Sequence, residues 1–340
     1  MIKNKALLGI LFFLSSLFTA YGSQGENKTA PEIRKTKTAR VVGYLSSDSF
    51  SRITFIEFCR LTHLNIAFAN PDKQGNLIFN GDIDAVVTYA KSVNPNIKIS
   101  ISLAGGVISS EQAFNWAWCI DKPENRSVLI QNIKKFVETH NLDGVDVDLE
   151  WGAVTSGYSD FVIDLRKSLP VGKLITAALP NTTRFEAVNN TALNTFDFIN
   201  IMAYDSTGPW SPNKKEQHSS LEFAKEGVEF WHKLQNVPSD KLTLGVPFYG
   251  YDFTSETVTS AAYSEIVAAG SQFADQDEAG MMYYNGRSTI ERKVEFASQN
   301  AGGIMIWELA QDSFDKYSLL NVIHKKYTSL KTKTSGLCGN

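Results

Sequence analysis

The sequence predicts a single parallel α/β fold, a (β/α)8 TIM barrel, on three observations. Eight short β-branched runs recur along the 340 residues, segments of helical periodicity lie between most of them, and no linker or internal repeat divides the chain. A doubly wound sheet is the alternative fold, but no G-x-G-x-x-G or G-x-x-x-x-G-K motif follows the first strand. The barrel is therefore the preferred interpretation.

The strands and the clearest helices follow one another in the order that a barrel requires. Strands are predicted at residues 40–45, 63–69, 97–104, 144–151, 174–179, 196–204, 242–249 and 303–309. Helices are predicted at residues 83–93, 126–139, 158–169, 220–234 and 289–299. Residues 39–330 are accordingly assigned to one barrel domain.

Composition excludes several classes of protein. Hydrophobic residues make up 43% and charged residues 20% of the chain, as in an ordinary globular protein. The 33 Lys and Arg residues nearly balance the 36 Asp and Glu residues without a long basic run, so nucleic acid is not an expected partner. The five histidines lack the spacing of metal ligands, so we expect neither a metal nor another cofactor. We also expect a monomer.

The N-terminus has the three-part pattern of a secretory signal peptide. Lys3 and Lys5 precede an apolar run that reaches Ala20, and small residues follow. A membrane anchor is the alternative, but the run is short for a transmembrane span. The mature chain is therefore expected to be exported, to the periplasm or the medium, with no membrane span. The segments outside the barrel are predicted to be a signal peptide over residues 1–22, a flexible polar arm over residues 23–38 and a C-terminal tail over residues 331–340.

The chain contains three cysteines, Cys59, Cys119 and Cys338. An odd number in an exported protein leaves at least one thiol free or bridged to another molecule. The sequence leaves the pairing open.

Alternation along the strands indicates which face of the sheet is internal. In the run FINIMAY, Ile199, Ile201 and Ala203 share one face, and Asn200, Met202 and Tyr204 share the other. In the run KISISLAG the aliphatic residues likewise oppose Ser100, Ser102 and Ala104. One face suits a covering layer of helices, and the small or polar face suits a narrow barrel interior.

The strongest chemical signal is the run DGVDVDLE, residues 143–150. Asp146, Asp148 and Glu150 lie two residues apart and project to the face opposite the aliphatic residues, into the barrel. Carboxylates in a poorly solvated interior cannot all ionise, so at least one should retain a proton, as a general acid requires. Glu150 comes last, at the C-terminal mouth of the barrel, where active sites lie. Asp143 has the opposite parity and is expected to play a supporting role.

Two other interpretations of this run are weaker. A solvated acidic edge strand does not explain the aliphatic residues between the carboxylates. A divalent cation site is chemically allowed, but ligands confined to one strand rarely enclose a hard cation.

The run D-x-x-D-x-D-x-E on a fourth barrel strand resembles glycoside hydrolase family 18, the chitinase and endo-β-N-acetylglucosaminidase family. Companion segments in collinear order extend the resemblance over about residues 39–325. They are SLAGG at residues 102–106, MAYD at residues 202–205, LGVPFYG at residues 244–250 and GGIMIW at residues 302–307.

The resemblance implies a substrate-assisted, retaining glycosidase. Glu150 would protonate the glycosidic oxygen, and the N-acetyl group of the substrate would attack its own anomeric carbon. Asp148 would orient the acetamide, Asp146 would share a proton with Asp148, and Tyr204 would donate its hydroxyl group to the acetamide oxygen.

Trp307 matches the tryptophan that forms the floor of the sugar site at the cleaved bond, as an aromatic face can stack on a pyranose. Met202 lies on the same interior face as Tyr204. Further expected sugar contacts are Tyr44, Phe68, Asp205, Tyr249 and the loop residue Trp210.

The sequence also departs from the family. Leu149 and Val107 stand where many of the chitinases have aromatic residues, and Tyr251 stands where an arginine is frequent. The segment between the seventh and eighth strands is interpreted as two helices with a loop, so the α+β insertion domain of many family chitinases is not expected.

Three functions are weighed. The first is an endo-chitinase acting on β-1,4-linked N-acetylglucosamine. The second is an endo-β-N-acetylglucosaminidase that cuts the chitobiose core of N-glycans. The third is a non-catalytic chitin-binding lectin, which usually lacks the acid that Glu150 supplies here. The expected partner in each case is a glycan that contains N-acetylglucosamine.

Overall fold

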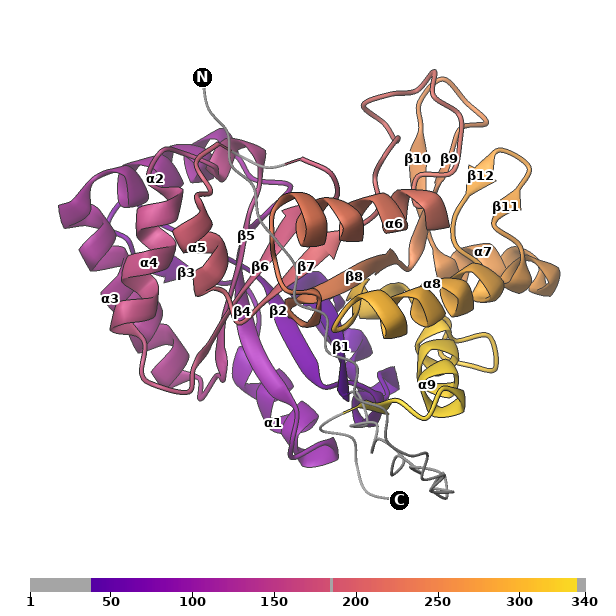
Figure 1. Ribbon diagram of the computed structural model, residues 1–340, viewed down its shortest axis with the longest axis horizontal. Helices are drawn as coiled ribbons and strands as arrows, with labels where there is room; N and C mark the ends of the chain where they lie inside the picture. The colour runs from indigo at the N-terminus through magenta and orange to yellow at the C-terminus, as the bar shows by residue number, and fades with distance from the viewer. Residues whose placement is uncertain (1–37, 184–185, 335–340) are drawn as a thin grey trace, which may run out of the picture. The chain divides into compact units, whose positions relative to one another are not determined.

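Eight parallel strands close into a barrel in the computed structural model, which describes residues 38–183 and 186–334 (Figure 1). Neighbours pair in the cyclic order β1-β13-β8-β7-β6-β5-β4-β2, and pairing of β2 with β1 closes the ring. The predicted (β/α)8 barrel is confirmed. The barrel strands are β1 (Thr38–Ser46), β2 (His63–Pro71), β4 (Lys98–Gly105), β5 (Gly144–Leu149), β6 (Leu174–Pro180), β7 (Phe198–Met202), β8 (Leu242–Pro247) and β13 (Gly303–Trp307).

Helices cover the outside of the barrel, and local capping explains several of their ends. Asp82 accepts a hydrogen bond from the backbone N–H of Ala85 at the start of the first helix, and Ser109 and Gln112 form a capping box at the second. The helices on the barrel are α1 (Ile83–Val93), α2 (Ser110–Asp121), α3 (Pro123–Thr139), α4 (Tyr158–Ser168), α5 (Asn190–Thr195), α6 (Leu221–Glu229), α8 (Arg287–Asn300) and α9 (Leu319–Ser329).

The helix predictions were incomplete. The first helix has the predicted ends, but the predicted helix 220–234 changes from α6 to a π-helix at Phe230–Leu234. The two 3-10 helices η1 (Ser47–Phe55) and η2 (Phe58–Arg60) follow β1, and a short strand β3 (Leu77–Ile78) follows β2. Among the helices not predicted, α5 is only six residues long, too short for a clear 3.6-residue period.

The segment between β8 and β13 contains two helices, α7 (Tyr263–Ala269) and α8, as expected, together with a small sheet that was not predicted. Its first part is a four-stranded antiparallel sheet in the order β10-β9-β12-β11, with a helix and a 3-10 helix beside it. Strands of two to four residues are too short to show a period of two in the sequence. These elements are β9 (Tyr249–Asp252), β10 (Thr259–Ala262), α7 (Tyr263–Ala269), η6 (Ser271–Asp275), β11 (Glu278–Ala279) and β12 (Met282–Tyr283). They belong to the same compact unit as the barrel.

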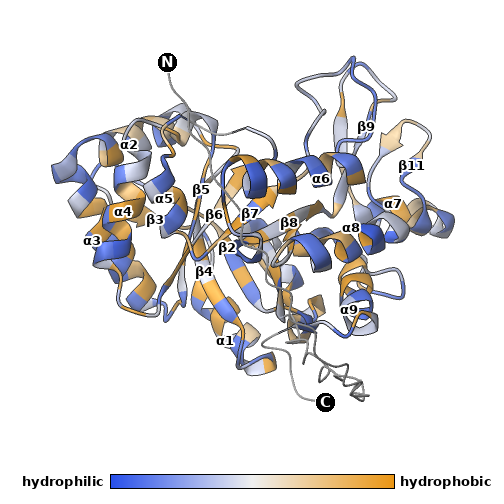
Figure 2. Ribbon diagram, in the orientation of Figure 1, coloured by the Kyte–Doolittle hydropathy of each residue, from blue (hydrophilic) through white to orange (hydrophobic). Residues whose placement is uncertain are grey.

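The outer and inner faces of the barrel strands belong to two different apolar clusters, in agreement with the predicted strand alternation. Ile199, Ile201 and Ala203 lie in the large cluster under the helices, whereas Tyr204 and Met202 lie in a second, smaller cluster. Figure 2 shows the matching alternation of hydrophilic and hydrophobic residues on helices such as α3 and α4.

Ala104 is an exception to the alternation. It joins the outer cluster, and its φ of 70° ends the regular alternation of β4.

The predicted signal peptide, nearly all of the predicted arm and Cys338 lie outside the described residues. Thr38, assigned to the arm, begins β1, and within the predicted tail Lys333–Thr334 forms strand β14 beside the start of β1. Cys119 is a buried, free thiol. Among the described residues, no helix has the length and apolar character needed to cross a membrane.

Candidate active site

Strand β5 carries two of the three predicted interior carboxyl groups, and the third follows directly after its last residue. Asp146 and Asp148 are buried, and Glu150 follows the end of the strand in a half-buried position. Val145 and Val147 face the outer apolar cluster. Because the aliphatic face is buried under helices, the carboxyl groups have only the barrel interior to occupy.

Asp146 lies at the centre of a hydrogen-bond network inside the barrel. Its Oδ2 accepts from the hydroxyl groups of Tyr44 and Ser102, each at 2.7 Å. Its Oδ1 accepts from Thr176 Oγ1 at 2.5 Å and from Asn200 Nδ2 at 3.3 Å. Burial nevertheless raises the pKa of Asp146, although these donors oppose the shift. Four donors from four strands thus hold this side chain in one orientation.

Asp148 forms a hydrogen bond with Glu150 rather than with Asp146. Burial, followed by the charges of Glu150 and Asp146, raises the pKa of Asp148 well above its usual range. Its Oδ1 has no hydrogen-bond partner within the described residues. Because two close carboxyl groups cannot both ionise easily, the pair retains a proton near neutral pH.

Glu150 is the outermost member of the series. Burial, followed by the charge of Asp205, raises the pKa of Glu150 to about 7. Gly106 lies beside it: a Cβ at that position would come within 2.9 Å of Glu150 Oε1. Only glycine therefore leaves this carboxyl group its present position.

Asp143 lies at the opposite end of β5. It accepts a hydrogen bond from the backbone N–H of Ile99 at 3.0 Å and forms ion pairs with Lys91 and Lys98. Burial favours a higher pKa, but these three partners hold the pKa of Asp143 below its usual value. The side chain therefore joins β4, β5 and α1 and lies apart from the other carboxyl groups.

The turn after β7 brings Tyr204 and Asp205 to the same interior. Among the described residues, the hydroxyl group of Tyr204 has one weak contact, 3.8 Å from the sulfur of Met305, so it can donate to a ligand. Asp205 has a φ of 64°, an uncommon value for a residue other than glycine. Its Oδ1 accepts from Tyr249 at 2.5 Å and from Tyr251 at 3.1 Å.

Aromatic side chains form one wall of the site. Trp307 stacks on Phe68 at 5.5 Å between ring centres and meets the edge of Tyr44 at 5.6 Å. Glu308, the next residue, accepts from Ser46 N at 2.7 Å and so ties the end of β13 to β1. Trp307 is half-buried and leaves part of its indole to the site.

The other predicted contact residues occupy different depths. Tyr249 is buried, Met202 is half-buried and Trp210 is 61% exposed in the loop after β7. The ring of Trp210 meets the edge of Tyr251 at 5.8 Å. Met202, Tyr249 and Trp210 therefore lie at or beyond the C-terminal ends of the barrel strands, whereas Tyr44 is buried in the barrel with its hydroxyl group on Asp146.

Sequence reasoning missed several residues of this region. Ser102, Thr176 and Asn200 hold Asp146. Strand alternation placed Ser102 and Asn200 on interior faces without assigning them a role, and it could have identified Thr176 in the same way. His218, one of the five histidines without metal-ligand spacing, is fully buried beside Asp205, with Nδ1 at 3.3 Å from Oδ1. No sequence signal separates it from the other histidines.

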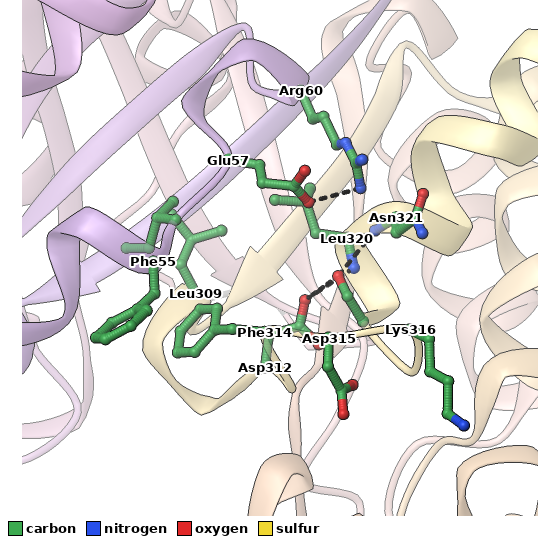
Figure 3. A pocket seen from close by; sticks show the side chains of 12 residues that line it. Phe55, Glu57, Arg60, Leu309, Asp312, Phe314, Asp315, Lys316, Leu320 and Asn321 are labelled. Atoms are coloured by element: carbon green, nitrogen blue, oxygen red, sulfur yellow. Dashed lines mark hydrogen bonds and ion pairs between the residues drawn. The ribbon is translucent and has the colours of Figure 1, made fainter.

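Within the described ranges, no group of three or more His, Cys, Asp or Glu side chains is arranged to hold a metal ion. A separate cavity of about 360 Å³ lies between η1 and the start of α9 (Figure 3). Its wall includes Asp312, which accepts from Leu319 N, Leu320 N and Ser318 Oγ and so caps α9. The cavity contains none of the predicted site residues.

The arrangement around Glu150 has a limited set of chemical abilities. A carboxyl group with a pKa of about 7 can donate and accept a proton near neutral pH. The weakly bonded hydroxyl group of Tyr204 can donate to a carbonyl oxygen, and the indole of Trp307 can stack on an apolar ring face. Together they suit acid–base chemistry on a ring-shaped, polar ligand.

Comparison with known proteins gives a consistent result. The model of the family "Glycosyl hydrolases family 18" matches residues 40–312. The crystal structure of the GH18 chitinase ChiB from the chitin utilization locus of Flavobacterium johnsoniae has 76% sequence identity and a TM-score of 0.88, covering 89% of this chain and 98% of that one.

More distant relatives are also chitinases. A chitinase structure from Bacteroides thetaiotaomicron is 30% identical with a TM-score of 0.75, covering 85% of this chain and 96% of that one. An endochitinase of Manduca sexta is 28% identical over 267 residues, which are 66% of this chain. The matched region spans 47% of that insect protein.

Proposed function

The chain belongs to glycosyl hydrolase family 18 and is a glycosidase, and on this premise we propose that it is an endo-chitinase that cleaves β-1,4-linked N-acetylglucosamine. The observation that carries the proposal is the hydrogen-bonded pair of Asp148 and Glu150 at the mouth of the barrel, which keeps a proton near neutral pH. The 76% identity with a chitinase supports the choice of substrate.

In the first half of the proposed reaction, Glu150 donates its proton to the glycosidic oxygen and the leaving sugar departs. The N-acetyl carbonyl oxygen of the substrate attacks the anomeric carbon and forms a cyclic oxazolinium ion. Asp148 accepts a hydrogen bond from the acetamide N–H, for which its unpartnered Oδ1 is available. Its carboxylate also stabilises the positive charge of the oxazolinium ion. Tyr204 donates its hydroxyl group to the acetamide oxygen.

In the second half, Glu150 acts as the base. It takes a proton from water, the water oxygen attacks the anomeric carbon, and the acetamide is restored with net retention of configuration. Asp146, held by its four donors, keeps a fixed position below Asp148. Trp307 stacks on the sugar at the cleaved bond, and Asp205 binds a polar group of the same substrate.

We also propose that residues 1–22 direct export and that the mature chain acts as a monomer outside the cytoplasm. The positive residues Lys3 and Lys5 before an apolar run support the first part.

Product analysis tests the proposed function. Wild-type protein is incubated with an N-acetylglucosamine hexamer and, separately, with a high-mannose glycoprotein, and products are identified by mass spectrometry. We expect short oligomers from the hexamer and an unchanged glycoprotein. Glycans released with one sugar left on the protein would instead establish an endo-β-N-acetylglucosaminidase. Binding of the hexamer without any product would establish a lectin.

The activity is expected to fall as the pH rises through about 7. The folded-state pKa of Glu150 lies above its ordinary value, so the acid is protonated below about pH 7 and ionised above it. The measurement is kcat/KM on the hexamer between pH 4 and 9. The fall in kcat/KM at high pH is called the alkaline limb below. An alkaline limb near pH 4.5, the ordinary pKa of a glutamate, would contradict the proposal that burial and Asp205 raise the pKa of Glu150.

A variant makes this pH test specific. Asp205→Asn removes a charge that raises the pKa of Glu150, so the alkaline limb should move to lower pH. Asp252→Asn serves as the matched control and should leave the limb unchanged. Asp252 is a half-buried residue at the end of β9, and its Oδ1 accepts a hydrogen bond from Thr254 N.

A further inference from the structure

The turn that carries Tyr204 and Asp205 is held by a second segment of the loop after β7. This segment, residues 217–219, is called the brace below and lies directly before α6. Ser219 Oγ donates to the carbonyl oxygen of Ala203 at 2.6 Å, and Ser206 N donates to the carbonyl oxygen of His218 at 3.0 Å. Hydrogen bonds on both sides of Tyr204 and Asp205 therefore join the turn to the brace.

His218 of the brace contacts three residues of the predicted sugar site or its border, namely Asp205, Tyr249 and Tyr251. Its ring is fully buried and lies 5.1 Å from the ring of Tyr249 and 4.9 Å from that of Tyr251. Its Nδ1 lies 3.4 Å from Asp205 N and 3.3 Å from Asp205 Oδ1. Since both tyrosines also donate to that oxygen, three side chains confine Asp205 from one side.

On its other side the brace is anchored by a buried lysine of α8, the helix that runs beside α6 (Figure 1). Lys293 Nζ donates to Ser219 O at 2.8 Å, to Ser219 Oγ at 2.6 Å and to Asn285 Oδ1 at 2.7 Å. Asn285 Nδ2 also donates to Ser219 O at 2.9 Å. Because Ser219 Oγ uses its own hydrogen toward Ala203, all three partners of Lys293 act as acceptors, and only an ammonium group supplies three donors.

The buried ammonium group of Lys293 is unusual for a protein interior. The side chain is fully buried, and its three hydrogen bonds go to neutral oxygens. Burial lowers the pKa of Lys293 to about 7, against the charges of Asp277 and Glu222. A buried ammonium group destabilises the fold relative to an apolar side chain of similar size. A requirement for a fixed brace would account for its presence.

We propose that Lys293 and His218 are positioning residues, which act through the brace to hold Tyr204 and Asp205 in place beside the substrate. The inference rests on the proposed function of that turn. The φ of 64° at Asp205 is an uncommon backbone conformation, and the hydrogen bonds to the brace are what keep the turn in it. Loss of the hydrogen bonds from Lys293 to Ser219 allows the backbone of the turn to leave this conformation, while the barrel strands beneath it are unaffected.

Several charged and titratable groups surround this turn, and the pKa of one of them, Glu150, depends on the position of Asp205. Asp205 faces His218 of the brace, Tyr249 and Tyr251 of β9, and Glu150 after β5. Lys214 of the same loop donates to Ser206 O at 3.2 Å. Movement of Asp205 away from Glu150 would remove one cause of the raised pKa of that acid, so the acid itself reports on the position of the turn.

The test compares Lys293→Met and Ser219→Ala with wild type and with Lys233→Met, a control at an exposed lysine paired with Glu229. A displacement of about 1 Å in a catalytic group can lower the rate about 100-fold. We therefore expect both brace variants to lower kcat on the hexamer about 10- to 100-fold with KM changed less than about threefold. The alkaline limb should also move to lower pH in both, and the control should match wild type.

Two further measurements keep the test decisive. Thermal unfolding identifies folded variants, and Ser219→Ala, which keeps the ammonium group, decides the outcome if Lys293→Met does not fold. Carbon NMR titration of the Glu150 carboxyl group needs no turnover, so it tests the brace even if wild type cleaves no substrate and the proposed function fails. Folded variants with wild-type kcat and an unchanged Glu150 titration would overturn the inference.

Discussion

Glu150→Gln is expected to lower kcat on the N-acetylglucosamine hexamer by about two to four orders of magnitude, the usual contribution of a positioned general acid or base. Glutamine keeps the size of the side chain and its contact with Asp148 but has no proton to give to the leaving oxygen. KM should change little, because the proposed contacts to the sugar come from other residues. The measurement is steady-state kinetics on the hexamer at pH 6.

The same substitution has a second expected consequence that separates loss of chemistry from loss of folding. Because the pKa of Glu150 is raised in the folded state, its stabilising effect is present below about pH 4.5 and is lost as the pH rises through about 7. Glutamine does not ionise, so the free energy of unfolding of the variant at pH 8 should equal or exceed that of wild type.

Glu229→Gln is the matched control for Glu150→Gln. This glutamate lies on the outside of α6, paired with Lys233, and its side chain is 60% exposed. Its replacement should leave kcat unchanged, because exposed ion pairs contribute little. Wild-type turnover by Glu150→Gln would reject both the proposed acid and the substrate-assisted mechanism.

Asp148→Asn is expected to lower kcat about 100- to 1,000-fold, the range found when one preorganised group that stabilises transition-state charge is removed. The Asp148–Glu150 pair holds one proton and one negative charge, and the proposed reaction develops positive charge next to it. Asparagine resembles the protonated acid in size, so folding should be preserved while the negative charge is lost.

The pH profile distinguishes this role from a simple packing defect. The charge of Asp148 forms part of a coupled pair, so its removal should make Glu150 ionise more easily and move the alkaline limb to lower pH. A variant with kcat within about threefold of wild type and an unmoved limb would show that Asp148 contributes no charge to the reaction, even if Glu150 proves essential.

Sequence reasoning predicted most of the barrel because both signals that it used are local. The period of two placed Asp146, Asp148 and Met202 on the interior face, and the period of 3.6 placed α1 with the observed ends. The small sheet after β8 was missed, since strands of two to four residues carry too little periodicity.

The candidate site could be predicted only in part for a related reason. Its carboxyl groups lie on one strand, two residues apart, and one short run of sequence contains them. Thr176 and Asn200 come from other strands, and their convergence on Asp146 depends on how β6 and β7 pair beside β5. The importance of Lys293 is not visible in the sequence, where it is one polar residue on a polar helix.

The sequence by itself determined the barrel, the side of each strand that faces its interior and the identity of the groups available there, because alternation is a property of neighbouring residues. Only the tertiary structure decided how those groups interact. It paired Asp148 with Glu150, brought Asp205 close enough to raise the pKa of Glu150, and buried Lys293 against the brace. Electrostatic energies depend on distance and burial between residues far apart in the chain, and no local pattern encodes them.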